Sequence, residues 1–438
     1  MNNWFSDFEE KSSGLALGGG GARGCYEIGM WKALQEHGLQ FACVSGTSIG
    51  ALVGAMYVQG SLDEMIEFVK DLKPTVIASN LFSFPESLGE AVKNRREIGS
   101  FLSRYILSGT GMDISPLKSE LDKMFRYQLF ENSPVNFACM TFNITEHKPI
   151  AYFKEEMNAE NAENIILASA SCYPAFPVLK LNGSEYIDGG YWDNVPIDLA
   201  ARMGAKKILA VDVEGPGLVL PVDPNLDVFL IKPILTLGNF LDFTAKSGMQ
   251  NLKAGYLEMN KLLETMCGFL YTFPAQEKNN LEFLDSYLDF MFQIWSIKIS
   301  DQQLEQIEKW AIGYSKSDLS DFLRQSRGTG ILIEGLAALA GVDPLKLWSV
   351  KTFMQNLMSR LAEHLQKSSR LGGLVDTAAP VTSPAQKMNA VCRSFQILKK
   401  APEQRGGAEL QSLAALYPGE VAMAWCWYFL EKVYGKYE

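Results

Sequence analysis

A serine between glycines is the residue of this sequence whose surroundings best suit nucleophilic chemistry. It lies in the segment Gly46-Thr47-Ser48-Ile49-Gly50, after the apolar run Phe41–Ser45 and before a small, apolar stretch of helical character that ends at Gly60. A predicted strand before Ser48 and a predicted helix after it put the serine on a sharp turn, where its hydroxyl projects from the fold. The flanking glycines permit strained backbone and close packing. Ser48 is therefore the candidate nucleophile.

A run of glycines forms a second candidate site, in the segment Gly18-Gly19-Gly20-Gly21-Ala22-Arg23-Gly24. It separates the apolar run Leu15–Leu17 from a helix predicted over Cys25–His37. Backbone N–H groups at a helix N-terminus stabilise an anion, which is either a nucleotide phosphate or the oxyanion of acyl transfer. No Lys-Ser or Lys-Thr pair of a P-loop follows, and Phe41-Ala42-Cys43-Val44 stands where a dinucleotide fold carries an acid. The oxyanion interpretation is favoured, and nucleotide binding is the weaker alternative.

An acid with adjacent glycines is the candidate base, in Tyr186-Ile187-Asp188-Gly189-Gly190 at the end of a short predicted strand. An isolated Asp-Gly pair usually marks a turn, so the weight of Asp188 comes from the two segments above. The chain has three histidines, His37, His147 and His364. Only His364 follows Ser48 and Asp188 in the order of a known triad. It lies in the middle of a predicted helix, where a solvated or internally satisfied side chain is the stronger expectation.

Composition narrows the class of protein. The 438 residues suggest two domains, and the formal net charge of −10 argues against a general nucleic-acid binder, which needs clustered Lys and Arg. Residues 1–264 hold 22 Lys and Arg against 32 Asp and Glu, and residues 265–438 hold 18 of each, which favours a boundary near residue 265. The seven cysteines are scattered without metal-like spacing, so we expect reduced, mostly buried thiols and no metal site.

The sequence also predicts where the protein works. Met1–Ser13 carries acids and no apolar core, so no secretory signal is visible. No stretch of about 18 uncharged apolar residues could form a membrane-spanning helix. We therefore expect a cytoplasmic protein that can still contact a membrane peripherally.

The elements expected around these segments alternate between strand and helix. Their order predicts an α/β fold, with a parallel-sheet core covered by helices on both faces. Further predicted elements are paired strands over 136–145 and 150–153, a strand over 207–213 and an amphipathic helix over 244–263. The rest of the chain is expected to be a mainly helical domain with a loop over 372–384.

Two aromatic-rich stretches leave alternatives open. Residues 74–112 are expected to form a lid or insertion over the sheet edge, where Phe82, Phe84, Leu88 and Phe101 line an acyl groove or, more simply, pack a satellite core. In the same segment, Lys93, Arg95, Arg96 and Arg104 meet phosphate head groups or form a solvated face, and the solvated face is favoured. Leu281–Ile297 either inserts at a membrane interface or packs in a core, and core packing is favoured because Asp285 and Asp289 would repel anionic lipids.

The three candidate segments, in this order, resemble the motifs of patatin-like phospholipases. Further residues resemble those before and after the family's Asp-Gly motif, namely Ala168-Ser169-Ala170-Ser171, Pro174, Phe176-Pro177, Asn194 and Pro196. Gly18, where many members have Asp or another residue, is a departure without evident chemical consequence. The resemblance covers residues 13–264 as a catalytic domain, and residues 265–438 form a second domain of unknown role.

The resemblance implies a lipid acyl hydrolase with a Ser48–Asp188 dyad, without histidine, metal or cofactor. The oxyanion hole would comprise Gly19, Gly20, Gly21 and Arg23, with Arg23 stabilising the loop or adding positive potential. Because a free Asp is a weak base at neutral pH, the site must be partly dry or Ser48 unusually polarised. The expected substrate is a phospholipid or lysophospholipid. The alternatives are an acyltransferase of related fold, and a regulated effector whose C-terminal domain binds a protein partner or a membrane.

Overall fold

The computed structural model describes residues 4–5, 8–79, 111–298, 304, 307, 330–370, 383–400, 402 and 407–434. The chain divides into two compact units, and the division falls between Met259 and Asn260. Each unit is described by itself below. Most of the expected insertion over 74–112, with its four apolar and four basic residues named above, lies outside the described residues, as does most of the expected loop over 372–384.

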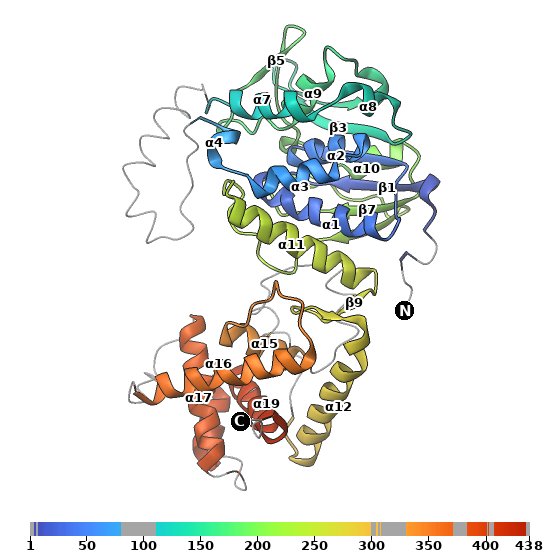
Figure 1. The fold of residues 1–438 in the computed structure, drawn as a ribbon. Coiled ribbons are helices and arrows are strands. Elements are labelled where there is room, and N and C mark those ends of the chain that lie inside the picture. Colours follow the sequence, from blue (N-terminus) through green and yellow to red (C-terminus); the bar gives the residue numbers. More distant parts are fainter. Residues whose placement is uncertain are drawn as a thin grey trace. The chain divides into compact units, whose positions relative to one another are not determined.

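The first unit is built on one mixed sheet of eight strands (Figure 1). The strands are β1 (Ser13–Leu17), β2 (Cys43–Thr47), β3 (Asn136–Asn143), β4 (Lys148–Phe153), β5 (Leu179–Leu181), β6 (Ser184–Asp188), β7 (Lys207–Val211) and β8 (Asp227–Ile231). Their order is β5-β6-β3-β2-β1-β7-β8, with β4 also paired to β3. The strands β3, β2, β1, β7 and β8 are mutually parallel. β4 and β6 run antiparallel to β3, and β5 in turn pairs antiparallel with β6. The α/β prediction is confirmed, and the sheet is mostly parallel rather than wholly parallel.

Helices cover both faces of this sheet. They are α1 (Cys25–Glu36), α2 (Ile49–Gln59), α3 (Leu62–Lys70), α4 (Pro74–Ile77), α7 (Ser115–Met124), α8 (Tyr127–Asn132), α9 (Ala162–Ser169), α10 (Ile197–Arg202) and α11 (Ala245–Leu262). On one face, Ala16 and Cys43 form a buried cluster with Ala200 of α10. On the other face, Val44 lies against Gly54 of α2. Since successive residues of a strand point to opposite faces, a continuous apolar strand buries both.

The element boundaries mostly agree with the sequence pattern. The helix expected over 244–263 is α11, and the paired strands expected over 136–145 and 150–153 are β3 and β4. The strand expected over 41–45 begins two residues later, at Cys43. Phe41 is buried, but its N–H donates to the Tyr57 hydroxyl at 3.1 Å instead of joining the sheet. An apolar run alone does not distinguish the residues of a strand from buried residues that precede it.

The second unit is mainly helical over its described residues, as predicted. Its elements are the short strands β9 (Met266–Cys267) and β10 (Phe273–Pro274), and the helices α12 (Lys278–Ile294), α15 (Gly330–Ala340), α16 (Val350–Arg370), α17 (Pro384–Lys400), α18 (Gly407–Leu416) and α19 (Pro418–Tyr434). The antiparallel pair β9–β10 was not expected. Aromatic packing joins α17 to α19, where the rings of Phe395 and Trp427 stack with centroids 3.8 Å apart.

The aromatic-rich helix α12 has two apolar faces. Leu281, Leu284, Leu288 and Phe292 are buried, so the favoured interpretation, core packing, is correct for that face. Phe283, Phe290 and Ile294 are instead exposed. The aromatic-rich composition of this stretch did not by itself reveal that division.

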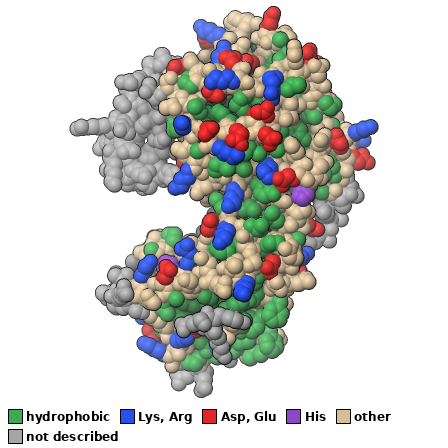
Figure 2. Space-filling model, viewed as in Figure 1, with side chains coloured by type: hydrophobic (Ala, Val, Ile, Leu, Met, Phe, Trp, Pro, Cys, Tyr) green, Lys and Arg blue, Asp and Glu red, His purple; other side chains and the backbone are tan. Residues whose placement is uncertain are grey.

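Other composition-based expectations can be compared with the structure. All seven cysteines are free thiols, and five of them are buried. None of the helices in the described ranges is long and apolar enough to cross a membrane. On the face of the first unit that Figure 2 shows, acidic and basic side chains are interspersed rather than gathered into one basic surface.

Candidate active site

Ser48 occupies a strained turn between β2 and α2. Its backbone angles are φ 57° and ψ −125°, in a region that residues with a side chain rarely adopt. The Ser48 N–H donates to the Ser169 hydroxyl at 3.0 Å, and this hydroxyl donates to the Met140 carbonyl at 2.7 Å. A Cβ atom on Gly50 would lie only 2.3 Å from the Leu17 carbonyl oxygen, so α2 can begin this close to β1 only with glycine there. The local sequence therefore places Ser48 at the carboxyl end of β2.

Strand pairing brings Asp188 to Ser48. Met140 of β3 pairs with Thr47, the residue before the serine, and the next residue, Thr141, pairs with Asp188. At both positions, β4 occupies one edge of β3. Both β2 and β6 must therefore pair with the other edge of β3. The end of β2 and the end of β6 therefore meet beside β3. The two candidate residues, 140 positions apart in the chain, are adjacent for this reason.

The Asp188 carboxyl is buried and remains basic enough to accept a proton. Its side chain is 5% exposed, and burial raises its pKa from the ordinary 3.8 to about 6. The nearby Ser48 hydroxyl and a hydrogen bond from the Gly190 N–H at 2.8 Å lower this pKa because they stabilise the carboxylate. At pH 7 the group is therefore about 90% ionised and far more basic than a solvated aspartate.

The glycine-rich loop lies directly against the serine. A Cβ atom on Gly19 would lie 3.0 Å from the Cβ atom of Ser48. The Gly19 N–H donates to the Asn194 carbonyl at 2.9 Å, and the Ala22 N–H donates to the Phe240 carbonyl at 2.8 Å. Within the described residues, the N–H groups of Gly20 and Gly21 have no such partner. These two are the donors that the loop can offer to an oxyanion, whereas Gly19 has already used its own.

Arg23 is held by the loops around it. Its guanidinium donates to the carbonyl oxygens of Gly238 at 2.9 Å, Val213 at 3.4 Å and Glu214. Burial lowers the pKa of this guanidinium, and the charges of Glu214 and Asp212 oppose that effect. Of the two roles that the sequence allowed for Arg23, the contacts support stabilisation of the glycine loop.

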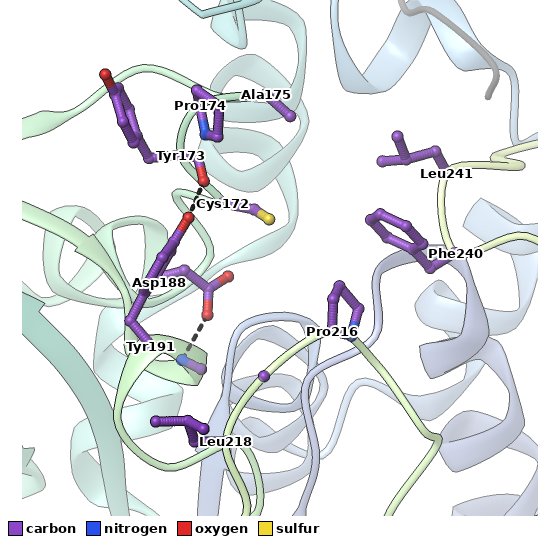
Figure 3. A pocket seen from close by; sticks show the side chains of 12 residues that line it. Cys172, Tyr173, Pro174, Ala175, Asp188, Tyr191, Pro216, Leu218, Phe240 and Leu241 are labelled. Carbon is purple, nitrogen blue, oxygen red and sulfur yellow. Dashed lines mark hydrogen bonds between the residues drawn. The ribbon is translucent and has the colours of Figure 1, made fainter. Parts of the chain in front are cut away.

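A pocket of about 490 Å³ opens beside Asp188. Its lining is mostly apolar and aromatic, with Cys172, Tyr173, Pro174, Ala175, Asp188, Gly190, Tyr191, Pro216, Gly217, Leu218, Phe240 and Leu241. Figure 3 shows Asp188 and Tyr191 on one side of this space and Pro216, Phe240 and Leu241 across from them. The Tyr191 hydroxyl donates to the Tyr173 carbonyl, which fixes one wall. The pocket can receive an apolar chain next to the carboxyl group.

A second, narrower cavity of about 70 Å³ is lined in part by the glycine loop. Gly21 and Ile49, the residue after the candidate nucleophile, line it together with Met56 and Leu121. Its lining is almost wholly apolar, but its volume accommodates far less of a chain than the first pocket does.

Two buried polar residues position the site, and motif reasoning assigned them no task. Ser169 accepts from the Ser48 N–H, as described above. Asn194 accepts the Gly19 N–H with its backbone carbonyl and donates its side-chain amide to the Gly19 carbonyl at 3.0 Å. Both lie in segments that supported the family resemblance, and their burial as polar residues is the signal that marks them.

The histidines take no part in the described contacts of the site. His37 follows the last residue of α1, and His147 lies in the turn between β3 and β4 with φ 55°. His364 lies in α16 of the second unit. In the described hydrogen bonds of Ser48 and Asp188, no partner is a histidine.

A strained serine between a strand and a helix lies next to a buried aspartate and a glycine loop. Together these features define an α/β protein with the layout of a serine hydrolase. Comparison of the chain with protein families then gives a match to part of it. Residues 15–201 match the model described as patatin-like phospholipase. The resemblance seen in the motifs is therefore confirmed over residues 15–201.

Curated proteins similar to this chain carry the name lysophospholipase NTE1. The protein of Mycosarcoma maydis is 32% identical over 203 residues, which are 46% of this chain and 10% of that protein. The protein of Scheffersomyces stipitis is 30% identical over 200 residues, 46% of this chain and 12% of that protein. The matched region thus spans 10–12% of the length of these relatives.

Among solved structures, the crystal structure of VipD from Legionella pneumophila is similar to this chain, with 13% sequence identity and a TM-score of 0.38. The match covers 96% of this chain and 90% of that one.

Proposed function

We propose that this protein is a lipid acyl hydrolase that cleaves carboxylic esters through an acyl-enzyme on Ser48. The observation that carries the proposal is that strand pairing brings Ser48, on its strained turn, next to the buried Asp188 carboxyl group. A nucleophile within hydrogen-bond reach of a base is the minimum arrangement for covalent acyl transfer.

In the first half of the reaction, the Ser48 oxygen attacks the ester carbonyl carbon while Asp188 accepts the hydroxyl proton. The tetrahedral oxyanion accepts hydrogen bonds from the N–H groups of Gly20 and Gly21, whose amides are free of partners within the described residues. The ester bond then breaks, and Asp188 returns the proton to the departing alcohol. The acyl group remains on Ser48.

In the second half, Asp188 takes a proton from a water molecule that attacks the acyl-enzyme. The intermediate collapses, the fatty acid leaves, and the Ser48 oxygen regains its proton. A pKa of about 6 suits both halves, because the group is mostly ionised at neutral pH yet still binds a proton readily. No histidine is needed in this scheme.

We propose a phospholipid or lysophospholipid as the substrate. The apolar walls of the 490 Å³ pocket suit an acyl chain, and the similar curated proteins are named lysophospholipases. We assign all reacting groups to residues 13–264, and we assign residues 265–438 a regulatory or docking role.

The test is release of free fatty acid from a panel of phospholipids, lysophospholipids and triglycerides, with Ser48→Ala as the inactive control. We expect release from at least one phospholipid or lysophospholipid, and none from the control. An acyl product formed with an added alcohol or thiol, in preference to free acid, would assign the protein to acyltransferases instead. Equal release by the Ser48→Ala variant would remove Ser48 from the reaction.

A further inference from the structure

Exposed apolar side chains gather at one place on the first unit. Among its described residues, seven large hydrophobic side chains are exposed, and only Leu129 stands apart from the others. The remaining six are Tyr191, Trp192, Leu218, Val219, Leu220 and Val222. Their exposed fractions run from 38% for Leu220 to 59% for Leu218. Scattered exposed apolar residues are normal, but a contiguous group marks an interaction surface.

These six residues, here called the apolar rim, come from two segments that lie side by side. The Leu218 N–H donates to the Gly190 carbonyl at 2.9 Å, and the Asn194 N–H donates to the Leu218 carbonyl. The segment 216–222 is therefore fixed against 190–194, and the apolar rim is one surface.

The apolar rim borders the mouth of the pocket beside Asp188. Tyr191 and Leu218 belong to the rim and also line that pocket (Figure 3). A long-chain ester that reaches the carboxyl group must pass these side chains. The rim is therefore placed where a lipid substrate would enter.

The charges around the rim indicate which lipid surface it fits. Residues 216–222 contain no charged side chain, and the nearest charged residues on either side, Glu214 and Asp223, are both acidic and exposed. A surface segment without basic side chains has no electrostatic attraction to anionic lipids. Tyr191 and Trp192 add two aromatic side chains with polar atoms, the types that favour the interfacial region of a bilayer.

We propose that the apolar rim is a membrane-docking surface that inserts into the interfacial region of a zwitterionic phospholipid bilayer. Docking there places the pocket mouth against the acyl chains and ester bonds of the lipid. The inference rests on the proposed function, since it explains how a buried dyad reaches an insoluble substrate.

The test uses the full chain carrying Ser48→Ala, so that vesicles stay intact, and measures co-flotation with phosphatidylcholine vesicles. The test variant adds Val219→Asp and Val222→Asp, two exposed rim residues that do not line the pocket. The matched control adds Leu129→Asp, the exposed apolar residue outside the rim. We expect the double substitution to weaken partitioning at least about tenfold, because burying each side chain favours the membrane and a charge opposes it. The control should bind as the parent does, at both low and high salt.

A second measurement separates this inference from the proposed function. With Ser48 present, Val219→Asp/Val222→Asp should hydrolyse a soluble short-chain ester normally and lose activity on phosphatidylcholine vesicles. Vesicle binding that is unchanged in this variant, or binding that requires anionic lipid, would overturn the docking surface and leave the chemistry standing. Vesicle binding that depends on the rim, in a wild-type protein that hydrolyses no ester, would support the docking surface and overturn the proposed function.

Discussion

Replacing Asp188 by Asn is the perturbation that tests the reasoning about the site most directly. Asn has the same shape and can still accept the Gly190 N–H, but its amide cannot take the Ser48 proton. We expect the rate of ester hydrolysis to fall by about two to four orders of magnitude, the usual contribution of a general base. The wild-type enzyme should lose activity on acidification, with kcat/KM half-maximal near the pKa of about 6 and about a tenth of its plateau at pH 5.

The same substitution should stabilise the protein. The pKa of Asp188 is higher in the folded state than its ordinary value of 3.8, so the folded protein binds the proton more tightly than the unfolded chain does. Stability contributed by this group is therefore present at low pH and is lost as the pH rises from about 4 through about 6. The difference between 3.8 and about 6 corresponds to about 3 kcal/mol of destabilisation above pH 6.

An amide in place of the carboxyl group removes this penalty. We expect Asp188→Asn to raise the melting temperature of the first unit by about 5–10 °C at pH 8 and by almost nothing at pH 4. Activity on a soluble short-chain ester and thermal unfolding at the two pH values form the assay. A variant that keeps near-normal turnover, or one that is less stable than wild type at pH 8, would refute the assignment of Asp188 as a buried base.

Four further outcomes are expected. A fluorophosphonate probe should label Ser48 alone, and a Ser48→Ala variant that is labelled equally would exclude this nucleophile. Gly21→Ala should lower turnover by about a hundredfold, because its Cβ would lie 2.3 Å from the Phe240 carbonyl oxygen at an amide proposed to hold the oxyanion; Gly38→Ala, at a similar positive φ with open space around it, is the matched control and should leave turnover unchanged. His364→Ala should alter turnover on a soluble ester by less than about twofold, and a collapse of activity in a folded protein would overturn the dyad. Burial raises the pKa of Glu27 well above its ordinary value, so Glu27→Gln should raise the melting temperature at pH 8 but not at pH 4, and an unchanged melting temperature at pH 8 would contradict this.

The sequence pattern was sufficient to propose candidate residues for the site, but it did not reveal the contacts between them. Glycines on both sides of Ser48 and after Asp188 follow from backbone requirements that few other residues meet, so local pattern was sufficient to find them. The meeting of Ser48 and Asp188 depends instead on β6 pairing antiparallel with β3 just beyond the end of β2. Strand order and direction arise from contacts between distant segments, which periodicity along the chain does not encode. The parallel-sheet core followed from the alternation of strands and helices, whereas the direction of β6 did not.

The roles within the glycine loop show a second limit. The four glycines from Gly18 to Gly21 cannot be distinguished in the sequence. In the structure, the Gly19 N–H donates to the Asn194 carbonyl, whereas the N–H groups of Gly20 and Gly21 have no partner within the described residues. The distinction comes from a residue 175 positions away. Likewise, nothing in Arg23 itself reveals that its guanidinium bonds to three loop carbonyls and so is engaged within the protein.

No histidine is among the described contacts of Ser48 and Asp188. The basicity that the proposed reaction needs must therefore come from the surroundings of the Asp188 carboxyl group. A solvated aspartate would be a poor base, so the carboxyl group is buried, which raises its pKa but destabilises its charged form. Burial without any hydrogen-bond donor would raise the pKa above about 7, and a carboxyl group that is neutral at pH 7 cannot accept a proton. The Gly190 N–H, which donates to the carboxylate, and the nearby Ser48 hydroxyl oppose this effect, and the pKa is about 6. A change that removed the Gly190 contact without exposing the carboxyl group should therefore move the acidic limb of the pH profile upward, toward neutrality, while leaving the nucleophile in place.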